Sequence, residues 1–196
     1  MRFLLPALAL TLAACGQGEP AQPPLDTAPL AGATIGGPFE LVSETGEAVR
    51  WTDFDGQWRM VYFGYTYCPD VCPFDVQRMM GGYNTFAKAH PDLAEAVTPI
   101  FITVDPERDT PEIVAEFTDA FSPALLGLTG TQEQIDAAAK AFVVYHAKGA
   151  VTENGGYLMD HSNQGYLFDP QGNPIALLPV DESAAGVAAE LEKWVR

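Results

Sequence analysis

Two cysteines separated by three residues, Cys68 and Cys72, are the residues of this chain best suited to chemistry. They lie in the stretch YTYCPDVCP, residues 65–73. A buried-strand pattern precedes this stretch and a helix-like pattern follows it, so the cysteines are expected near a helix N-terminus, where backbone N–H groups and the helix dipole favour anions. The sequence therefore predicts two thiols that ionise more readily than free cysteine. Thiolates bind metal or attack disulfides.

The spacing of the cysteines leaves metal binding and a disulfide both open. Thioredoxin-type redox motifs separate their cysteines by two residues. In a helix, this spacing would place the Cβ atoms of the two cysteines roughly 5–6 Å apart, whereas a disulfide needs about 3.8 Å. The helical distance would instead suit two metal–sulfur bonds of about 2.3 Å each to one ion. Pro69 and Pro73 disfavour helix at the residues before them, so an ordered loop is expected and a disulfide is not excluded. Copper(I), zinc and iron–sulfur clusters are the metals that thiolates favour.

The elements around the cysteines are expected to alternate between strands and helices. Strands are predicted near residues 39–42, 48–51, 58–63, 98–104, 125–128, 143–147, 166–168 and 175–178, and helices near 75–89, 110–121, 131–142 and 183–195. The cysteines follow the first core strand, and a hairpin precedes the last helix. This order predicts an α/β, thioredoxin-like fold, with a mixed central sheet flanked by helices and an N-terminal β-hairpin extension.

A metal held by two thiolates needs a further ligand, and histidine is the commonest one. His90 is expected to end a helix and His146 to lie half-buried at a strand end, both in structural roles. His161 precedes the last hairpin, in a loop that faces the cysteine turn in the thioredoxin layout. No proline occurs between residues 151 and 169, so an imidazole stands where thioredoxins keep a cis-proline. Asp160 is either a solvated acid or a partner that orients this ring.

The first 14 residues have the features of a secretory signal peptide, with one arginine and a short apolar run that cannot span a membrane. They lead into Leu12-Ala13-Ala14-Cys15, which resembles the lipobox of bacterial lipoproteins. We therefore predict a lipoprotein signal peptide at 1–14, a lipidated Cys15 and a flexible tether at 15–37, and one domain at 38–196. An ordinary signal peptide with an incidental cysteine is the alternative.

The charge of the chain limits its partners. The 26 acidic and 10 basic residues give a formal net charge of −16. Such a surface argues against binding to nucleic acid and against electrostatic attachment to anionic lipid. The acids are scattered along the chain, so most are expected to form a solvated face.

Three blocks of residues together resemble the Sco/SenC/PrrC family: the cysteine stretch 65–73, VDPERDTP at 104–111, and DHS at 160–162 followed by YLFDP at 166–170. The resemblance runs from about Phe39 to the C-terminus. It implies a thioredoxin-like domain that binds one copper ion, Cu(I) or Cu(II), through Cys68, Cys72 and His161. Glu107 and Arg108 match the second block, and a structural ion pair or loop brace is expected of them.

The resemblance implies two alternative functions. The first is a metallochaperone that helps assemble the CuA centre of cytochrome c oxidase subunit II, with another periplasmic copper chaperone as a candidate donor. The second is a thiol-disulfide oxidoreductase that reduces the CuA-ligand cysteines or acts in redox signalling, in which Cys68 and Cys72 would be catalytic and could form a disulfide. Many relatives are held by a transmembrane helix, whereas here the lipobox predicts a lipid anchor on the periplasmic side of a bacterial membrane.

Overall fold

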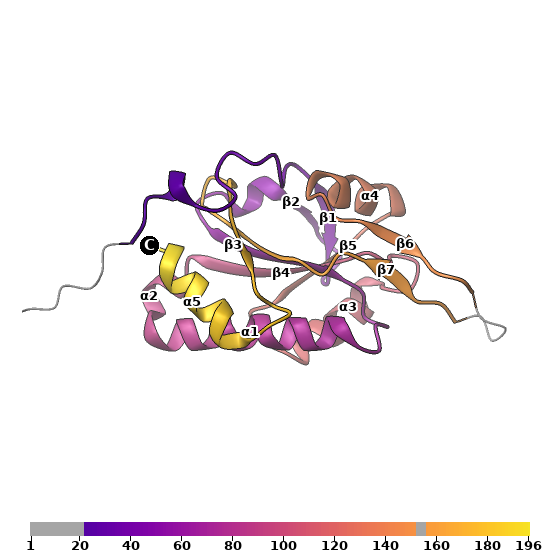
Figure 1. The fold of residues 1–196 in the computed structure, drawn as a ribbon. Coiled ribbons are helices and arrows are strands. Elements are labelled where there is room, and N and C mark those ends of the chain that lie inside the picture. Colours follow the sequence, from indigo (N-terminus) through magenta and orange to yellow (C-terminus); the bar gives the residue numbers. More distant parts are fainter. Residues whose placement is uncertain (1–21, 152–155) are drawn as a thin grey trace, which may run out of the picture.

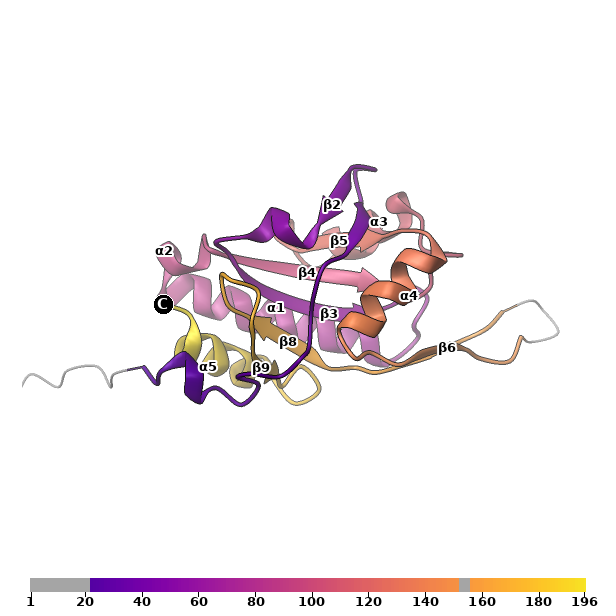
Figure 2. The ribbon, with the colours of Figure 1, turned by 90° about the horizontal axis from the view of Figure 1, so that it is seen from above.

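The central sheet of the computed structural model, which describes residues 22–151 and 156–196, has seven strands in the order β2-β1-β5-β4-β3-β8-β9 (Figures 1 and 2). Strands β3, β4 and β5 are parallel to one another, and the remaining neighbours pair antiparallel, so the predicted mixed sheet is confirmed. The strands are β1 (Glu40–Ser43), β2 (Ala48–Arg50), β3 (Trp58–Gly64), β4 (Val97–Thr103), β5 (Leu126–Thr129), β8 (Gly165–Phe168) and β9 (Pro174–Leu178).

Helices cover both faces of this sheet. Helices α1 and α5 lie side by side on one face, and α4 lies over the other (Figure 1). The helices are α1 (Val71–Ala89), α2 (Pro91–Ala94), α3 (Pro111–Asp119), α4 (Gln132–Ala141) and α5 (Ala184–Trp194), with short 3-10 turns η1 (Leu25–Thr27) and η2 (Trp51–Phe54). None of the helices in the described residues is long and apolar enough to cross a membrane.

The two central strands, β3 and β4, place the cysteine turn. All seven residues of β3 are buried, as its nearly continuous apolar run predicts. Its parallel ladder with β4 runs without a break from Trp58 opposite Val97 to Gly64 opposite Thr103. Because both strands end at the same edge of the sheet, the loop after β3 and the loop after β4 lie next to each other there. The first loop carries Cys68 and the second carries the 104–111 block.

A separate antiparallel pair, β6 (His146–Lys148) and β7 (Met159–His161), extends away from the body of the domain (Figures 1 and 2). Their register sets His146 opposite His161. The sequence predicted the first strand near this place, but it placed His161 in a loop. The structure instead ends strand β7 at His161, and the chain then turns back toward the central sheet and β8.

Helix α1 begins at Val71, earlier than the predicted Asp75, so Cys72 lies in a helical turn rather than in a loop. Pro73 is tolerated there because the N–H groups of a first helical turn need no intrahelical partner. The middle of this helix contains the pair Gly81-Gly82. A Cβ atom on Gly82 would lie 2.5 Å from the Cβ atom of Val187, so this glycine lets α5 pack closely against α1.

Residues 22–37 are not the flexible tether that their composition predicted, because they pack along the domain. Ala28 is buried, and partly buried Leu25, Leu30 and Ile35 pack against the core. The Leu30 N–H donates to the carbonyl of Ile175, and the Gly36 N–H donates to that of Ala141. The predicted signal peptide and Cys15 lie outside the described residues, as do residues 16–21 of the tether.

Candidate metal centre

The structure brings Cys68, Cys72 and His161 together at the edge of the sheet where β3 and β4 end. The two sulfurs and one imidazole nitrogen all lie within 4.8 Å of one another, and both cysteines are free thiols. The Nε2 atom of His161 is 3.1 Å from the Sγ atom of Cys72. Small movements of these side chains would bring all three atoms within about 2.0–2.3 Å of a single ion.

The Cys68 sulfur sits at the N-terminus of α1. Asp70 holds the N-cap position, but its side chain makes no capping hydrogen bond. The Cys72 backbone N–H instead points at the Cys68 Sγ atom, 3.4 Å away. Because the first N–H groups of a helix lack intrahelical acceptors, this sulfur takes the place that a capping oxygen usually fills. The helix thereby orients one ligand and carries the other in its first turn.

The prediction that both thiols ionise readily is wrong for Cys72. Its side chain is fully buried, and this burial raises the pKa of the Cys72 thiol well above that of free cysteine. Loss of solvation therefore outweighs the helix dipole. Cys68 is partly exposed. The metal-free site thus holds one accessible sulfur and one buried thiol, and a bound cation would have to supply the charge that keeps Cys72 deprotonated.

The His161 ring is oriented for metal binding by a backbone carbonyl. Its Nδ1 atom lies 2.8 Å from the carbonyl oxygen of Ser162, which can only accept, so Nδ1 carries the proton and Nε2 offers its lone pair to the sulfurs. Burial lowers the pKa of His161, which favours the neutral ring that a metal requires. The ring of Tyr65 meets the imidazole edge-on at 5.7 Å. Asp160, the orienting residue considered from the sequence, is exposed instead.

The other two histidines lie outside this group. His90 forms the C-cap of α1, where its backbone N–H bonds to Phe86 and its ring packs on the Phe86 ring at 5.2 Å. His146 pairs with His161 across the β6–β7 ladder, but its Nε2 atom lies 3.3 Å from a carboxylate oxygen of Asp136. Both histidines thus have the structural roles that the sequence predicted.

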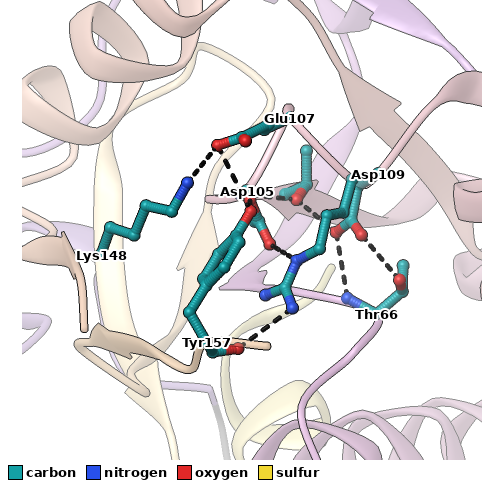
Figure 3. A network of polar contacts seen from close by, with 8 residues as sticks. Thr66, Asp105, Glu107, Asp109, Lys148 and Tyr157 are labelled. Carbon is teal, nitrogen blue, oxygen red and sulfur yellow. Dashed lines mark hydrogen bonds and ion pairs between the residues drawn. The ribbon is translucent and has the colours of Figure 1, made fainter. Parts of the chain in front are cut away.

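The 104–111 block braces the site from the neighbouring loop (Figure 3). Arg108 donates to Asp105 at 2.6 Å and to the carbonyl of Tyr157 at 3.0 Å, and its guanidinium lies 3.6 Å from the centre of the Tyr157 ring. Glu107 pairs with Lys148 of β6 at 2.5 Å. The expected structural ion pair and loop brace are therefore both present. They tie the β6–β7 hairpin, and with it His161, to the end of β4.

The surroundings of the site are open and partly apolar. Tyr67, Val71 and Phe74 are 44–53% exposed beside the two cysteines. A groove of about 580 Å³ lies between the cysteine turn and the β6–β7 hairpin, and Tyr67, Arg108 and Leu158 are among its lining residues. We call Tyr67, Val71 and Phe74 the apolar rim. Exposed apolar side chains gathered in this way mark surfaces that contact other molecules.

The donor set of two thiolates and one imidazole suits a soft or borderline ion. Copper(I) and zinc(II) both accept sulfur and imidazole ligands, and three protein ligands leave one position of a tetrahedral ion open. A closed structural site would bury all its ligands and fill every position. Cys68 and His161 remain partly exposed, so ligands from another molecule can reach an ion held here.

Comparison with known proteins agrees with this geometry. The profile of the SCO1/SenC family matches residues 27–196. The chain is 50% identical to Protein SenC from Rhodobacter capsulatus over 144 residues, covering 72% of this chain and 62% of that protein. It is 40% identical to the human mitochondrial SCO1 homolog over 164 residues, covering 83% and 53%. The chain thus spans less than two thirds of the length of these relatives.

Comparison with solved structures identifies the fold. The crystal structure of Arabidopsis thaliana ScoI with copper bound is similar, with a TM-score of 0.75 and 35% identity over 81% of this chain and 96% of that one. The thioredoxin domain of a thiol-disulfide oxidoreductase from Bacteroides vulgatus has a TM-score of 0.58 at 15% identity, covering 83% and 96%, and so shares the fold alone. The predicted thioredoxin-like fold is confirmed, and the chain belongs to the SCO1/SenC family.

Proposed function

We propose that this protein is a copper-binding metallochaperone that helps assemble the CuA centre of cytochrome c oxidase subunit II. One observation carries the proposal: the sulfurs of Cys68 and Cys72 and the Nε2 atom of His161 converge within 4.8 Å at an accessible edge of the domain. Copper is favoured over zinc because the similar Arabidopsis thaliana structure is described with copper bound. Copper is cargo in this account, held by one domain and passed to another.

The ligand types fit a carrier that meets both oxidation states of copper. Thiolates are soft ligands that favour Cu(I), and imidazole also suits Cu(II). Transfer would proceed by ligand exchange, in which thiols and imidazoles of the acceptor replace the carrier's ligands one at a time. Cys68 is partly exposed while Cys72 is buried, so we expect the bond to Cys68 to exchange before the bond to Cys72. The apolar rim would contact the acceptor during the exchange.

A thiol-disulfide oxidoreductase is the second candidate, favoured by the difference in exposure between the two free thiols. The Cys68 thiolate would attack a disulfide of subunit II, forming a mixed disulfide and releasing one target thiolate. Cys72 would then lose its proton to the first target thiolate and attack the Cys68 sulfur, which releases the second target thiolate and leaves a Cys68–Cys72 disulfide. An external dithiol would have to reduce that disulfide. This role needs both cysteines and no imidazole ligand.

We further propose that the protein acts on the periplasmic side of a bacterial membrane, lipid-anchored through Cys15. The support is the sequence alone: the apolar run and the lipobox-like Leu12-Ala13-Ala14-Cys15. Another periplasmic copper chaperone is the candidate copper donor. Mass spectrometry of the membrane-extracted protein tests the anchor, because lipidation of Cys15 would leave a mature chain that starts at Cys15 and carries acyl groups.

Two parallel assays with the soluble CuA domain of subunit II test the function. The first mixes the copper-loaded protein with the reduced, metal-free CuA domain and follows the CuA absorption. The second mixes the reduced, metal-free protein with the disulfide form of that domain and counts the thiols that form on that domain alone, by mass spectrometry after alkylation. A carrier transfers copper in the first assay, and His161→Ala abolishes that transfer. A reductase works only in the second assay, and His161→Ala leaves its rate nearly unchanged.

A further inference from the structure

Asp109 is a fully buried carboxylate beside the cysteine turn. It lies in the loop after β4, and three hydrogen bonds converge on its side chain. The Thr66 hydroxyl donates to Oδ1 at 2.6 Å, and the Thr66 backbone N–H and the Thr103 hydroxyl donate to Oδ2 at 3.0 and 2.5 Å (Figure 3). The Thr129 hydroxyl also donates to the Asp109 carbonyl at 2.7 Å. Asp109 therefore joins the ends of β4 and β5 to the segment that carries Cys68.

A buried carboxylate in this position needs an explanation, because removing a charged group from water costs several kcal/mol. Within the described residues Asp109 has no ion-pair partner at 4 Å or less; its compensation comes from the threonines and the backbone N–H. A network of this kind stabilises one arrangement of the groups that it connects, since any other arrangement leaves buried polar atoms unpaired. Here the connected groups are the end of β4 and the start of the cysteine turn.

Side chains of the cysteine turn also contribute to holding it: Tyr65 is buried, and the Arg108 guanidinium lies 4.9 Å from the centre of the Tyr67 ring. Residues 65–70 belong to neither β3 nor α1. The Cys68 N–H reaches the carbonyl of Tyr65 at 3.3 Å, and this bond stays within the turn itself. Thr66 therefore provides a tie from the turn to another loop, two residues before Cys68. A small displacement of Thr66 would be passed directly to the position of the Cys68 sulfur.

We propose that Asp109 is a positioning residue of the metal centre, which fixes the Cys68 sulfur opposite Cys72 and His161 by holding Thr66 through its backbone N–H and its hydroxyl. Asp109 touches neither the metal nor a ligand. It acts as outer partners of metal sites do, by limiting the movement of a ligand before the ion arrives. The metal-binding consequence rests on the proposed function, whereas the effect on the position of Cys68 is a property of the metal-free protein.

Three variants and one control test this proposal. Asp109→Asn keeps the shape of the side chain but replaces one acceptor oxygen by a donor. Thr66→Val removes the hydrogen bond from the Thr66 hydroxyl to Asp109 and leaves the backbone N–H bond, whereas Thr66→Ser keeps a hydroxyl at this position. The control is Thr118→Val, because Thr118 is also fully buried and its hydroxyl donates to a carboxylate, that of Glu44, at 2.8 Å. Thr118 lies in α3, away from the cysteines.

Two measurements are compared: copper(I) affinity by competition with a chromogenic chelator, and the rate at which iodoacetamide modifies Cys68 in the metal-free protein. Asp109→Asn should lower the affinity by about 10–100-fold and change the Cys68 rate several-fold. Thr66→Val should shift both values in the same direction, and Thr66→Ser should recover them. Thr118→Val should lower the melting temperature and leave both values unchanged.

The proposal is overturned if Asp109→Asn and Thr66→Val lose thermal stability as Thr118→Val does while their Cys68 rate and copper affinity stay at the wild-type values. Failure of the proposed function is a separate result: the wild-type protein would then bind no copper. In that case the Cys68 rates alone decide the positioning role. An Asp109→Asn rate equal to wild type would reject the role, and a changed rate in Asp109→Asn and Thr66→Val, but not in Thr118→Val, would support it.

Discussion

The His161 imidazole and the Cys72 thiol lie 3.1 Å apart, although 89 positions of the chain separate them. Cys72 is placed by the parallel β3–β4 core and the first turn of α1, and His161 by the β6–β7 hairpin. The site therefore forms only when these parts of the fold have come together. Metal binding and folding are linked in such a case, since the unfolded chain has no preformed site.

Replacing His161 by alanine should remove one of three ligands and leave the two sulfurs. We expect copper(II) binding, seen as coloured thiolate-to-copper absorption, to be lost, and copper affinity to fall by on the order of 100-fold or more. His146→Ala is the matched control, because His146 faces His161 across the hairpin yet bonds to Asp136. The ligand assignment fails if His146→Ala removes the absorption and His161→Ala preserves it.

The two thiols of the metal-free protein should differ in reactivity. Cys68 is partly exposed, while burial both shields Cys72 and raises the pKa of its thiol, so Cys72 stays protonated as the pH rises past the value at which free cysteine ionises. At pH 8 we expect iodoacetamide to modify Cys68 faster than Cys72 by on the order of tenfold or more. Peptide mapping after short exposures measures this. Similar rates in the folded protein, matching those in urea, would contradict the burial of Cys72.

Removing residues 22–37 should destabilise the domain. Partly buried Leu25, Leu30 and Ile35 and buried Ala28 pack against the core, which corresponds to roughly 2–4 kcal/mol of apolar burial. A chain that starts at Pro38 should melt about 5–15 °C below one that starts at Gln22. Thermal unfolding by circular dichroism measures the difference. Equal melting temperatures would show that the segment behaves as a tether in solution.

The apolar rim should matter for transfer and not for copper binding. Phe74 is 53% exposed two residues after Cys72, and large aromatic side chains are enriched among the few interface residues whose truncation costs more than about 1 kcal/mol. Phe74→Ala should therefore slow copper transfer to the CuA domain about tenfold while leaving copper affinity unchanged. The control is Leu177→Ala in β9, where Leu177 is 47% exposed and outside the rim. Equal transfer rates for both variants would exclude the rim from the contact.

Much of the site could be predicted because chain order, spacing and residue type carry the information. The apolar run of β3 predicts a buried strand, and the cysteines that follow it must lie at the sheet edge. The start of the helix predicted near 131–142 agrees with α4, which begins with a capping box made by Thr131 and Gln134. The thioredoxin layout then placed His161 opposite the cysteine turn.

Other features depend on tertiary contacts that the sequence does not display. The pKa of the Cys72 thiol is raised chiefly by burial in the folded domain, so an argument from the helix dipole alone gave the wrong direction. The His161 ring is held by a backbone carbonyl, which leaves no mark in residue type. Asp109 is one of several acids in its loop, and its hydrogen bonds to Thr66 and Thr103, which distinguish it from its neighbours, appear only in the folded structure. The composition of residues 22–37 is poor in large apolar residues, but Leu25, Leu30 and Ile35 each pack against the core.

X-ray absorption spectroscopy of the copper-loaded, reduced domain tests the central claim most directly, because it counts the sulfur and nitrogen atoms bound to the ion. We predict one copper per chain, with two sulfur neighbours from Cys68 and Cys72 and one imidazole nitrogen that disappears in His161→Ala. A copper ion bound without sulfur, or a spectrum unchanged by His161→Ala, would contradict it.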